Sequence, residues 1–227
     1  MKITYLGHAT FLVEMNGKKI VFDPFITGNE LATDIDVDSL EVDYIFVTHA
    51  HQDHVLDVER IAKNNPNALL VSNFEIVTWF GNKGIKGHGM NHGGKYSFDF
   101  GTAKYVTAIH SSMLPDGSNG GNPGGFVLWN GSTCIYMAGD TALTKDMELI
   151  PKTCPKLDVA ILPIGDNFTM GYEDAALASD FVACDHVIGC HYDTFPPIKI
   201  DKSKAMAHFE KKGKKLMLPD IGESINI

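Results

Sequence analysis

The stretch DYIFVTHAHQDHVLD, from Asp43 to Asp57, changes character halfway. Its first part, DYIFVT, is rich in β-branched and aromatic residues and predicts a buried strand. Directly after it, three histidines and an aspartate fall within the six residues from His49 to His54. Imidazoles and carboxylates are common ligands of divalent metal ions, so this density of them at a strand end indicates a metal site.

The spacing within this segment divides the ligand types into two sets. His49 and His51 are two residues apart in an extended chain, so both imidazoles can point the same way and hold one ion. If a helix begins at Asp53, then Asp53 and His54 point towards a second position beside the first. That is the arrangement of a two-metal hydrolytic centre.

Other histidines and aspartates also follow directly after strand-like runs. Strand ends of one sheet lie close together and commonly carry functional side chains. His110 can complete the ligands of the first ion, His191 those of the second, and Asp140 can bridge both with its two carboxylate oxygens. The candidate metal ligands are therefore His49, His51, Asp53, His54, His110, Asp140 and His191.

Five further residues are candidates for supporting roles. Asp23 is placed to accept the free N–H of a metal-bound imidazole, although an aspartate before proline also forms turns. His8 is either an outer-shell or substrate-facing residue or a satisfied core histidine. Asp166, Asn167 and Asn122 are candidates for the substrate pocket, with turn formation as the alternative.

Four more loop residues bear on the pocket. His88 and His92 lie in a glycine-rich stretch and are expected at the pocket rim or in a plain loop. Met90 and Phe168 are candidates for apolar pocket walls, although single apolar residues in loops usually just pack.

Local patterns predict a chain rich in strands with fewer helices. Runs of β-branched and aromatic residues bounded by Gly, Pro, Asn or Asp predict strands; they lie at 2–7, 10–15, 18–23, 43–48, 67–72, 95–100, 103–110, 124–130, 133–139, 158–164 and 185–190. Helices are expected at 53–64, 73–80, 144–150, 172–183 and 202–212.

Two Asn-Gly pairs predict tight two-residue hairpins, at Asn16-Gly17 and Asn130-Gly131. Each half of the chain therefore contains a strand, an Asn-Gly turn, a second strand and then an aspartate. Two similar β-rich halves with helices indicate an α/β (α+β) fold, a four-layer αββα sandwich of two sheets with helices outside. No composition break marks a linker, so residues 1–227 are expected to form one domain.

Composition limits the classes of partner. The formal net charge of −9 provides no positive field for a phosphate backbone, so nucleic-acid binding is not expected. The chain contains no apolar run long enough for a membrane span and no signal-peptide pattern at its start, and its four cysteines form no CxxC pair. We expect a cytoplasmic protein with a small-molecule substrate; the oligomeric state is left open.

The motif His49-x-His51-x-Asp53-His54, with His110, Asp140 and His191, resembles that of the metallo-β-lactamase superfamily. Longer motifs resemble the small metal-dependent hydrolases related to L-ascorbate-6-phosphate lactonase; they are GHATFLVE, DPFITGN, GGNPGGF, AGDT, LPIGDNFTMG, EDAA and HYDTFPPI. The resemblance implies the αββα fold. It also implies that the two histidine sets hold one ion each, with Asp140 between them.

The expected function is that of a metal-dependent hydrolase. Two divalent ions can lower the pKa of a shared water and supply hydroxide to a small ester-like substrate, a lactone or a phosphodiester. Asp53 is the candidate catalytic residue, because it can accept the proton of that water. Nitrogen and oxygen ligands suit zinc, taken first, and also manganese, iron or nickel. The alternatives are a thioesterase-type hydrolase of the same superfamily and a non-catalytic, metal-stabilised binding or sensing protein.

Overall fold

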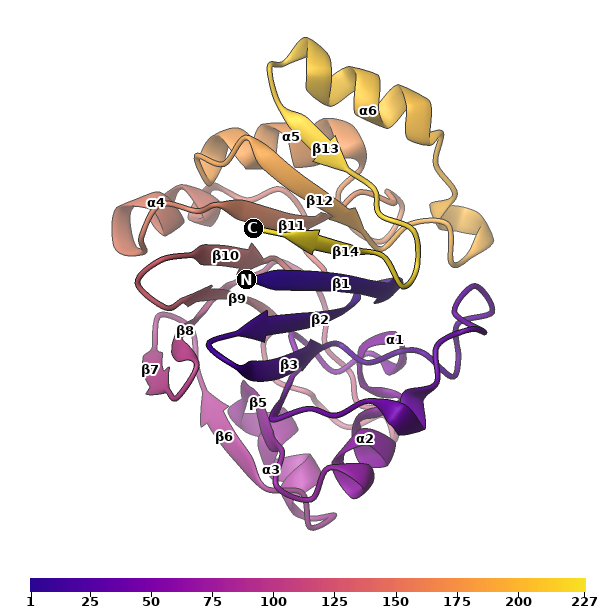
Figure 1. Cartoon of the computed structure of the whole chain (residues 1–227), viewed down its shortest axis with the longest axis vertical. Helices are drawn as coiled ribbons and strands as arrows, with labels where there is room; N and C mark the ends of the chain where they lie inside the picture. The colour runs from indigo at the N-terminus through magenta and orange to yellow at the C-terminus, as the bar shows by residue number, and fades with distance from the viewer.

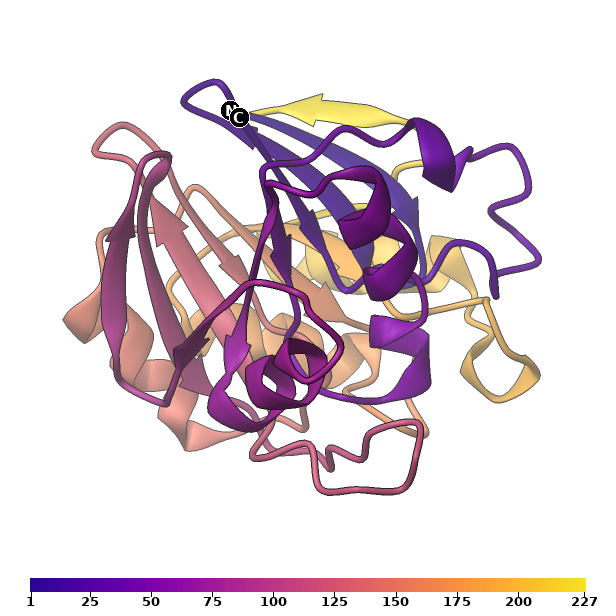
Figure 2. The ribbon, with the colours of Figure 1, turned by 90° about the horizontal axis from the view of Figure 1, so that it is seen from below.

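Two seven-stranded sheets packed face to face form the centre of the computed structural model, which describes all residues 1–227 (Figures 1 and 2). The first sheet has the order β14 (Ser224–Asn226), β1 (Lys2–Gly7), β2 (Thr10–Met15), β3 (Lys18–Phe22), β4 (Tyr44–Phe46), β5 (Leu69–Asn73) and β6 (Gly87–Met90). The second has the order β7 (Lys95–Phe98), β8 (Gly101–Thr107), β9 (Gly124–Trp129), β10 (Cys134–Met137), β11 (Val159–Pro163), β12 (His186–Cys190) and β13 (Lys215–Met217).

The two sheets have the same pairing pattern. In the first, β14, β1, β2 and β3 pair antiparallel, and β3, β4, β5 and β6 pair parallel. In the second, β7 to β10 pair antiparallel, and β10 to β13 pair parallel. The repetition suggested by the two Asn-Gly hairpins therefore extends over both sheets. The carboxyl ends of β3, β4, β10, β11 and β12 lead into the segments that carry the candidate ligands and their neighbours.

Helices cover the outer face of each sheet (Figure 2). The first sheet packs against α1 (Gln52–Val55), α2 (Val58–Asn64) and α3 (Phe74–Gly81). The second packs against α4 (Ile150–Thr153), α5 (Tyr172–Phe181) and α6 (Lys202–Lys211). Short 3-10 helices lie at Val37–Ser39, Lys145–Leu149 and Pro196–Ile198. None of the helices has the length and apolar character that crossing a bilayer requires.

Strand alternation divides the buried side chains among three cores. Along β4, Tyr44 and Phe46 enter the core between the sheets, whereas Ile45 enters the core under α1, α2 and α3. Along β11, Ile161 faces the other sheet and Leu162 faces the helices of the second half. Because successive side chains of a strand point to opposite faces, strands with apolar residues on both faces must be covered on both sides. This confirms the predicted αββα sandwich.

Several local predictions are corrected. The predicted helix at 53–64 is split into α1 and α2, because the Asp57 side chain between them accepts hydrogen bonds from the N–H groups of Ile26 and Thr27. The helix predicted at 144–150 is a 3-10 helix followed by α4. Three short strands, β6, β13 and β14, were not predicted, and β14 lies beside β1, which places the two chain ends next to each other (Figure 1).

Only one Asn-Gly hairpin has the predicted turn. Asn16 and Gly17 both have positive φ angles, 50° and 74°, as a two-residue turn requires. Between β9 and β10 the connection is a four-residue loop in which Asn130 does not adopt a positive φ. There the Asn130 side chain accepts hydrogen bonds from the N–H groups of Ser132 and Thr133, so the prediction of a two-residue turn is wrong at this position.

Candidate metal centre

The fold brings all seven predicted ligands together. The segment after β4 supplies His49 and His51 and, through α1, Asp53 and His54, while β8, β10 and β12 lead to the other three. Their ligand atoms form overlapping groups in which all atoms lie within 4.8 Å of one another. We call this set the His/Asp cluster; it comprises His49, His51, Asp53, His54, His110, Asp140 and His191.

One group within the cluster consists of His49, His51 and His110. His49 Nε2 and His51 Nδ1 lie 3.1 Å apart, and two nitrogens bound to one ion at about 2.1 Å lie roughly 3–3.5 Å apart. The outer nitrogens are held by neighbours that were not predicted. Thr48 Oγ1 is 3.1 Å from His49 Nδ1, and Ser111 Oγ is 3.2 Å from His51 Nε2. Both neighbours directly adjoin predicted ligands, and that adjacency was the only signal in the sequence.

The other group consists of Asp53, His54 and His191, with His8 beside them. Asp53 Oδ2 lies 3.9 Å from His54 Nε2 and 3.7 Å from His191 Nε2. His8 is buried; its Nε2 is 3.1 Å from Asp53 Oδ2, and its Nδ1 is 2.9 Å from Thr194 Oγ1. Burial lowers the pKa of His8 to about 4, so its imidazole is neutral and can donate to the Asp53 carboxylate.

Asp140 lies between the two groups. Its Oδ2 is 2.9 Å from His191 Nε2, 3.4 Å from His54 Nε2, 3.6 Å from His110 Nε2 and 3.9 Å from His49 Nε2. A single carboxylate oxygen thus faces imidazoles of both groups. This position is compatible with the bridging role predicted for Asp140, which stays a prediction.

Asp23 lies behind the cluster and is fully buried. Its Oδ2 is 2.9 Å from His54 Nδ1 and accepts a hydrogen bond from the Thr48 hydroxyl, while its Oδ1 accepts one from the Thr48 N–H. It therefore occupies the outer-shell position described for carboxylates that fix the tautomer of a ligating histidine. Three residues here, His8, Asp23 and His191, have φ between 43° and 56°, and such left-handed backbone in non-glycine residues concentrates at functional sites.

The electrostatics of the cluster are strongly coupled. Burial lowers the pKa of His49 well below its usual value. For His54 and His191 burial opposes the charged form, but Asp140 and the other carboxylates outweigh it, raising the pKa of His54 well above normal and that of His191 to about 9. The pKa values of Asp53 and Asp140 are depressed, because the imidazolium charges outweigh the effect of burial.

The donor set fits divalent metal ions. His54 Nε2 makes no hydrogen bond although it is buried, and it points at the cluster from an imidazole fixed on its other side by Asp23. Such an unpaired buried polar atom is costly unless something binds it. The cluster offers only nitrogen and carboxylate oxygen donors, and Cys190 faces the core between the sheets, where burial raises its pKa. The residues present therefore suit metals that accept imidazole and carboxylate.

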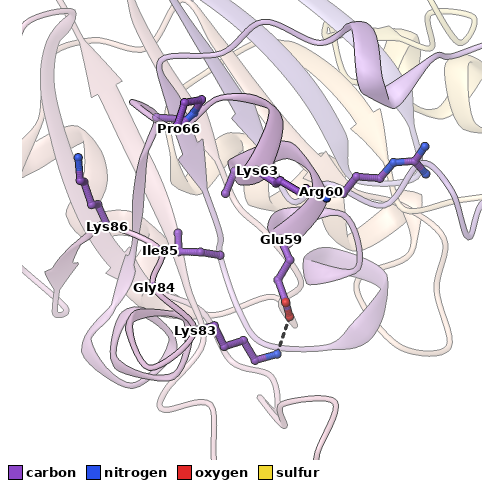
Figure 3. Close-up of a pocket in the computed structure, with 10 residues that line it drawn as sticks. Glu59, Arg60, Lys63, Pro66, Lys83, Gly84, Ile85 and Lys86 are labelled. Atoms are coloured by element: carbon purple, nitrogen blue, oxygen red, sulfur yellow. Dashed lines mark hydrogen bonds and ion pairs between the residues drawn. The ribbon is translucent and has the colours of Figure 1, made fainter.

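A cavity of about 300 Å³ opens over the cluster. It is lined by five members of the cluster together with Ser111, Phe168 and Phe195. A larger cavity, of about 560 Å³, lies elsewhere, between α2 and the segment that joins α3 to β6 (Figure 3). Its walls carry Lys63, Lys83 and Lys86 and no histidine, so it offers no comparable chemistry.

Most of the remaining predicted residues lie outside the cavity lining. Asp166 and Asn167 form an exposed turn after β11, and Asn122 is exposed in the loop before β9, where its backbone carbonyl accepts a hydrogen bond from Tyr105. His88 packs its ring against Tyr96 on the strands β6 and β7. Of the apolar candidates, Phe168 lines the cavity, whereas the prediction for Met90 is wrong, because strand pairing in β6 buries its side chain in the core between the sheets. Phe195, in the HYDTFPPI stretch, also lines the cavity and was not singled out.

Comparison with known proteins identifies the class that this fold and site define. The model of the beta-lactamase superfamily domain matches residues 2–191. The chain therefore belongs to the metallo-β-lactamase superfamily.

Within this superfamily the chain is similar to proteins named UPF0173 metal-dependent hydrolase. One from Flavobacterium johnsoniae is 59% identical over 227 residues and one from Christiangramia forsetii is 58% identical over 228 residues, each covering 100% of both chains. These relatives place the chain among the metal-dependent hydrolases, as its sequence predicted.

Solved structures agree with this placement. Igni18, a metallo hydrolase from the archaeon Ignicoccus hospitalis, matches with a TM-score of 0.89 and 34% identity over 99% of this chain and 97% of its own. An isothiocyanate hydrolase from Delia radicum gut bacteria matches with a TM-score of 0.80 and 21% identity over 100% and 99% of the two chains, a likeness of fold alone.

Proposed function

We propose that the protein hydrolyses a small ester-like substrate, a lactone or a phosphodiester, with two divalent ions held by the His/Asp cluster. His49, His51 and His110 would hold one ion. Asp53, His54 and His191 would hold the other, and Asp140 would bridge the two. The observation that carries this proposal is the convergence of seven ligand side chains, drawn from both sheets, beneath one cavity.

When bound, two such ions supply hydroxide near neutral pH and polarise the reacting bond. Asp53 is the residue that would take up a proton during the reaction. Its side chain is 25% exposed, against 4% for that of Asp140, and it lines the cavity, so its carboxylate can reach a water there. His8 donates to Asp53 Oδ2 and keeps the carboxylate oriented.

The surrounding residues keep the imidazoles in the orientation that metal binding requires. Asp23 accepts from His54 Nδ1, which directs His54 Nε2 to the cluster. Thr48 and Ser111 contact the outward nitrogens of His49 and His51 in the same manner. A site fixed in this way before the substrate arrives needs little reorganisation during the reaction.

The donor set supports zinc as the first candidate, followed by manganese, iron and nickel. Imidazole suits zinc, iron and nickel, and carboxylate suits manganese as well. Because the cluster contains no thiolate, its donor types do not distinguish among these four metals. Metal analysis of the purified protein decides the order.

The test combines metal analysis with a turnover screen. Protein loaded separately with Zn, Mn, Fe or Ni is assayed on lactones, phosphodiesters and thioesters, and the expected result is hydrolysis of at least one class that is lost on chelation. A His51→Ala variant should lose one ion and about a hundredfold or more of the activity. His88→Ala is the matched control, since His88 packs on Tyr96 outside the cavity lining and should leave both unchanged.

The outcomes separate the alternatives. Turnover of thioesters in preference to oxygen esters would favour a thioesterase-type hydrolase. Metal binding without turnover of any class would overturn the proposal and favour a metal-stabilised binding or sensing protein. Full activity of His51→Ala would overturn the ligand assignment.

A further inference from the structure

The part of the cavity that lies beyond the His/Asp cluster is aromatic. Apart from Ser111, the only residues that line it from outside the cluster are Phe168 and Phe195. Its volume of about 300 Å³ is at the lower end of the range of roughly 300–1,000 Å³ that small-molecule sites occupy. The group that flanks the reacting bond of a substrate must therefore be small and must contact these two rings.

Phe168 is held at the cavity by a strained turn. The preceding residues, Asp166 and Asn167, both have left-handed backbone, with φ of 62° and 56°. The turn is closed by a hydrogen bond from the Asp166 N–H to the Met170 carbonyl. Phe168 itself is 53% exposed. Asp and Asn tolerate this backbone conformation, so the turn holds Phe168 in the cavity lining, where its exposed ring is available for contact with a ligand.

Phe195 is supported from behind. Its ring lies 5.4 Å from that of His8, edge to face, and 6.2 Å from that of the buried Phe25. These contacts fix its position, while another part of the ring lines the cavity. The aromatic surface is therefore in place without any closing movement of the loop.

No lysine or arginine lines the cavity. The single arginine, Arg60, extends away from Lys83 and Lys86 (Figure 3) and pairs with Asp38 through two hydrogen bonds. Lys202, the first residue of α6, pairs with Asp193 and lies over the Tyr192 ring. A negatively charged group of the substrate remote from the metals would thus be taken out of water without a partner, which is costly.

We propose that the substrate is a small ester or lactone whose group beside the reacting bond is uncharged and apolar or aromatic, and that Phe168 and Phe195 select it. This inference rests on the proposed function and adds the substrate class. Substrates carrying a phosphate or carboxylate away from the reacting bond are discriminated against.

A matched pair of substrates tests this selection. Para-nitrophenyl butyrate and para-nitrophenyl succinate share the ester bond, the leaving group and the chain length, but the second ends in a carboxylate where the first ends in a methyl group. The succinate also hydrolyses spontaneously, because its carboxylate attacks its own ester to give the cyclic anhydride and p-nitrophenolate, so each rate is corrected for the reaction without enzyme. We then expect kcat/KM to be about tenfold or more higher for the butyrate. Phe168→Ala and Phe195→Ala should each raise its KM about threefold to tenfold, the range for one aromatic contact, with little change in kcat.

Phe74→Ala is the matched control, because Phe74 is also an exposed phenylalanine, at the start of α3 and outside the cavity lining, and should leave KM unchanged. Phe168→Lys should shift the preference towards the succinate. An equal or higher kcat/KM for the succinate in the unaltered protein, or an unchanged KM in both alanine variants, would overturn the inference.

A binding measurement separates failure of this inference from failure of the proposed function. Butyrophenone and benzoylpropionate form a second matched pair that cannot be hydrolysed, and their binding to the metal-loaded protein is measured by calorimetry. Tighter binding of butyrophenone that weakens in both alanine variants supports the aromatic subsite even if no ester is turned over. Equal binding of the pair would overturn it even in an active enzyme.

Discussion

Asp23 and Asp140 lie at equivalent places in the two sheets, yet their surroundings differ. Each follows the second strand of an Asn-Gly hairpin, β3 or β10, at the point where the sheet changes from antiparallel to parallel pairing. Asp140 faces four imidazoles at the centre of the cluster, whereas Asp23 is one layer behind and contacts Thr48 and His54.

The difference follows from where the ligand-rich segment is attached. The segment THAHQDH continues from β4, the neighbour of β3. Its Thr48 N–H therefore donates a hydrogen bond to the Asp23 carboxylate. The second sheet has no such segment after β11. Asp140 therefore remains open to His49 and His54 from the first sheet as well as to the two histidines that follow strands of its own sheet, His110 and His191. Two similar halves thus supply one aspartate that faces the imidazoles of the cluster and one that holds His54 from behind.

The largest expected effect comes from Asp140→Asn, which keeps the shape of the side chain and removes its charge. Because four imidazoles of both groups face this oxygen, we expect loss of bound metal and a fall in kcat/KM of about a thousandfold or more. Metal content and turnover are measured on the same sample. Asp43→Asn, at the opposite end of the strands, serves as the control, and full metal content in Asp140→Asn would refute the bridging role.

Asp23→Asn should have a smaller effect on the same site. The amide presents a donor where His54 Nδ1 needs an acceptor, so we expect metal affinity to fall about 10–100-fold, with activity largely restored at high metal concentration. Competition with a chelator measures the affinity. An effect as large as that of Asp140→Asn would show that the two aspartates contribute equally to metal binding. An unchanged affinity would show that Asp23 only forms a turn.

His191 and Asn73 form a second pair of equivalent positions. His191 follows β12, and Asn73 ends the equivalent strand β5 and caps α3. Only His191 titrates. Its pKa in the metal-free protein is raised from 6.5 to about 9 by Asp140 and Asp53 against the opposing effect of burial, so the folded form retains a proton that the unfolded form has lost.

The stabilisation that this proton provides is complete below pH 6.5 and is lost as the pH rises through about 9. The free energy of unfolding of the metal-free protein should therefore fall across this window, by up to about 1.4 kcal/mol per pH unit for one proton. Urea unfolding with a chelator present measures it. His191→Gln should reduce the slope by the share of one proton, because His54, whose pKa is also raised, still contributes. A stability that rises with pH in the unaltered protein would contradict the assignment.

The smallest effects distinguish the two hairpins. Asn130→Ala removes the oxygen that accepts from the Ser132 and Thr133 N–H groups and should cost about 1 kcal/mol. Asn16→Gly should cost less, because glycine readily adopts the positive φ of Asn16 and the turn itself is kept; what is lost is the side-chain hydrogen bonds to the Phe100 carbonyl and to the exposed Asn130 amide. Urea unfolding of both variants tests this, and equal costs would show that the two turns are held in the same way.

Much of the fold could be predicted from local patterns. Alternating apolar runs marked most strands, because strands buried on both faces leave a strong signal in the sequence. The short strands β6, β13 and β14 left no such signal, since their pairing partners, and not their own composition, make them strands. The break between α1 and α2 was not predicted for a similar reason. It depends on hydrogen bonds from Ile26 and Thr27 to Asp57, some thirty positions later in the chain.

The sequence by itself determined the αββα fold, the family and the list of candidate ligands, because strand periodicity and the THAHQDH spacing are local properties of the chain. Only the tertiary structure decided which aspartate faces the metal positions and which lies behind them. It alone placed Phe168 and Phe195 over the cluster and kept Asp166 and Asn167 out of the cavity. Contacts of this kind join residues far apart in the chain, and they are set by how the two sheets pack.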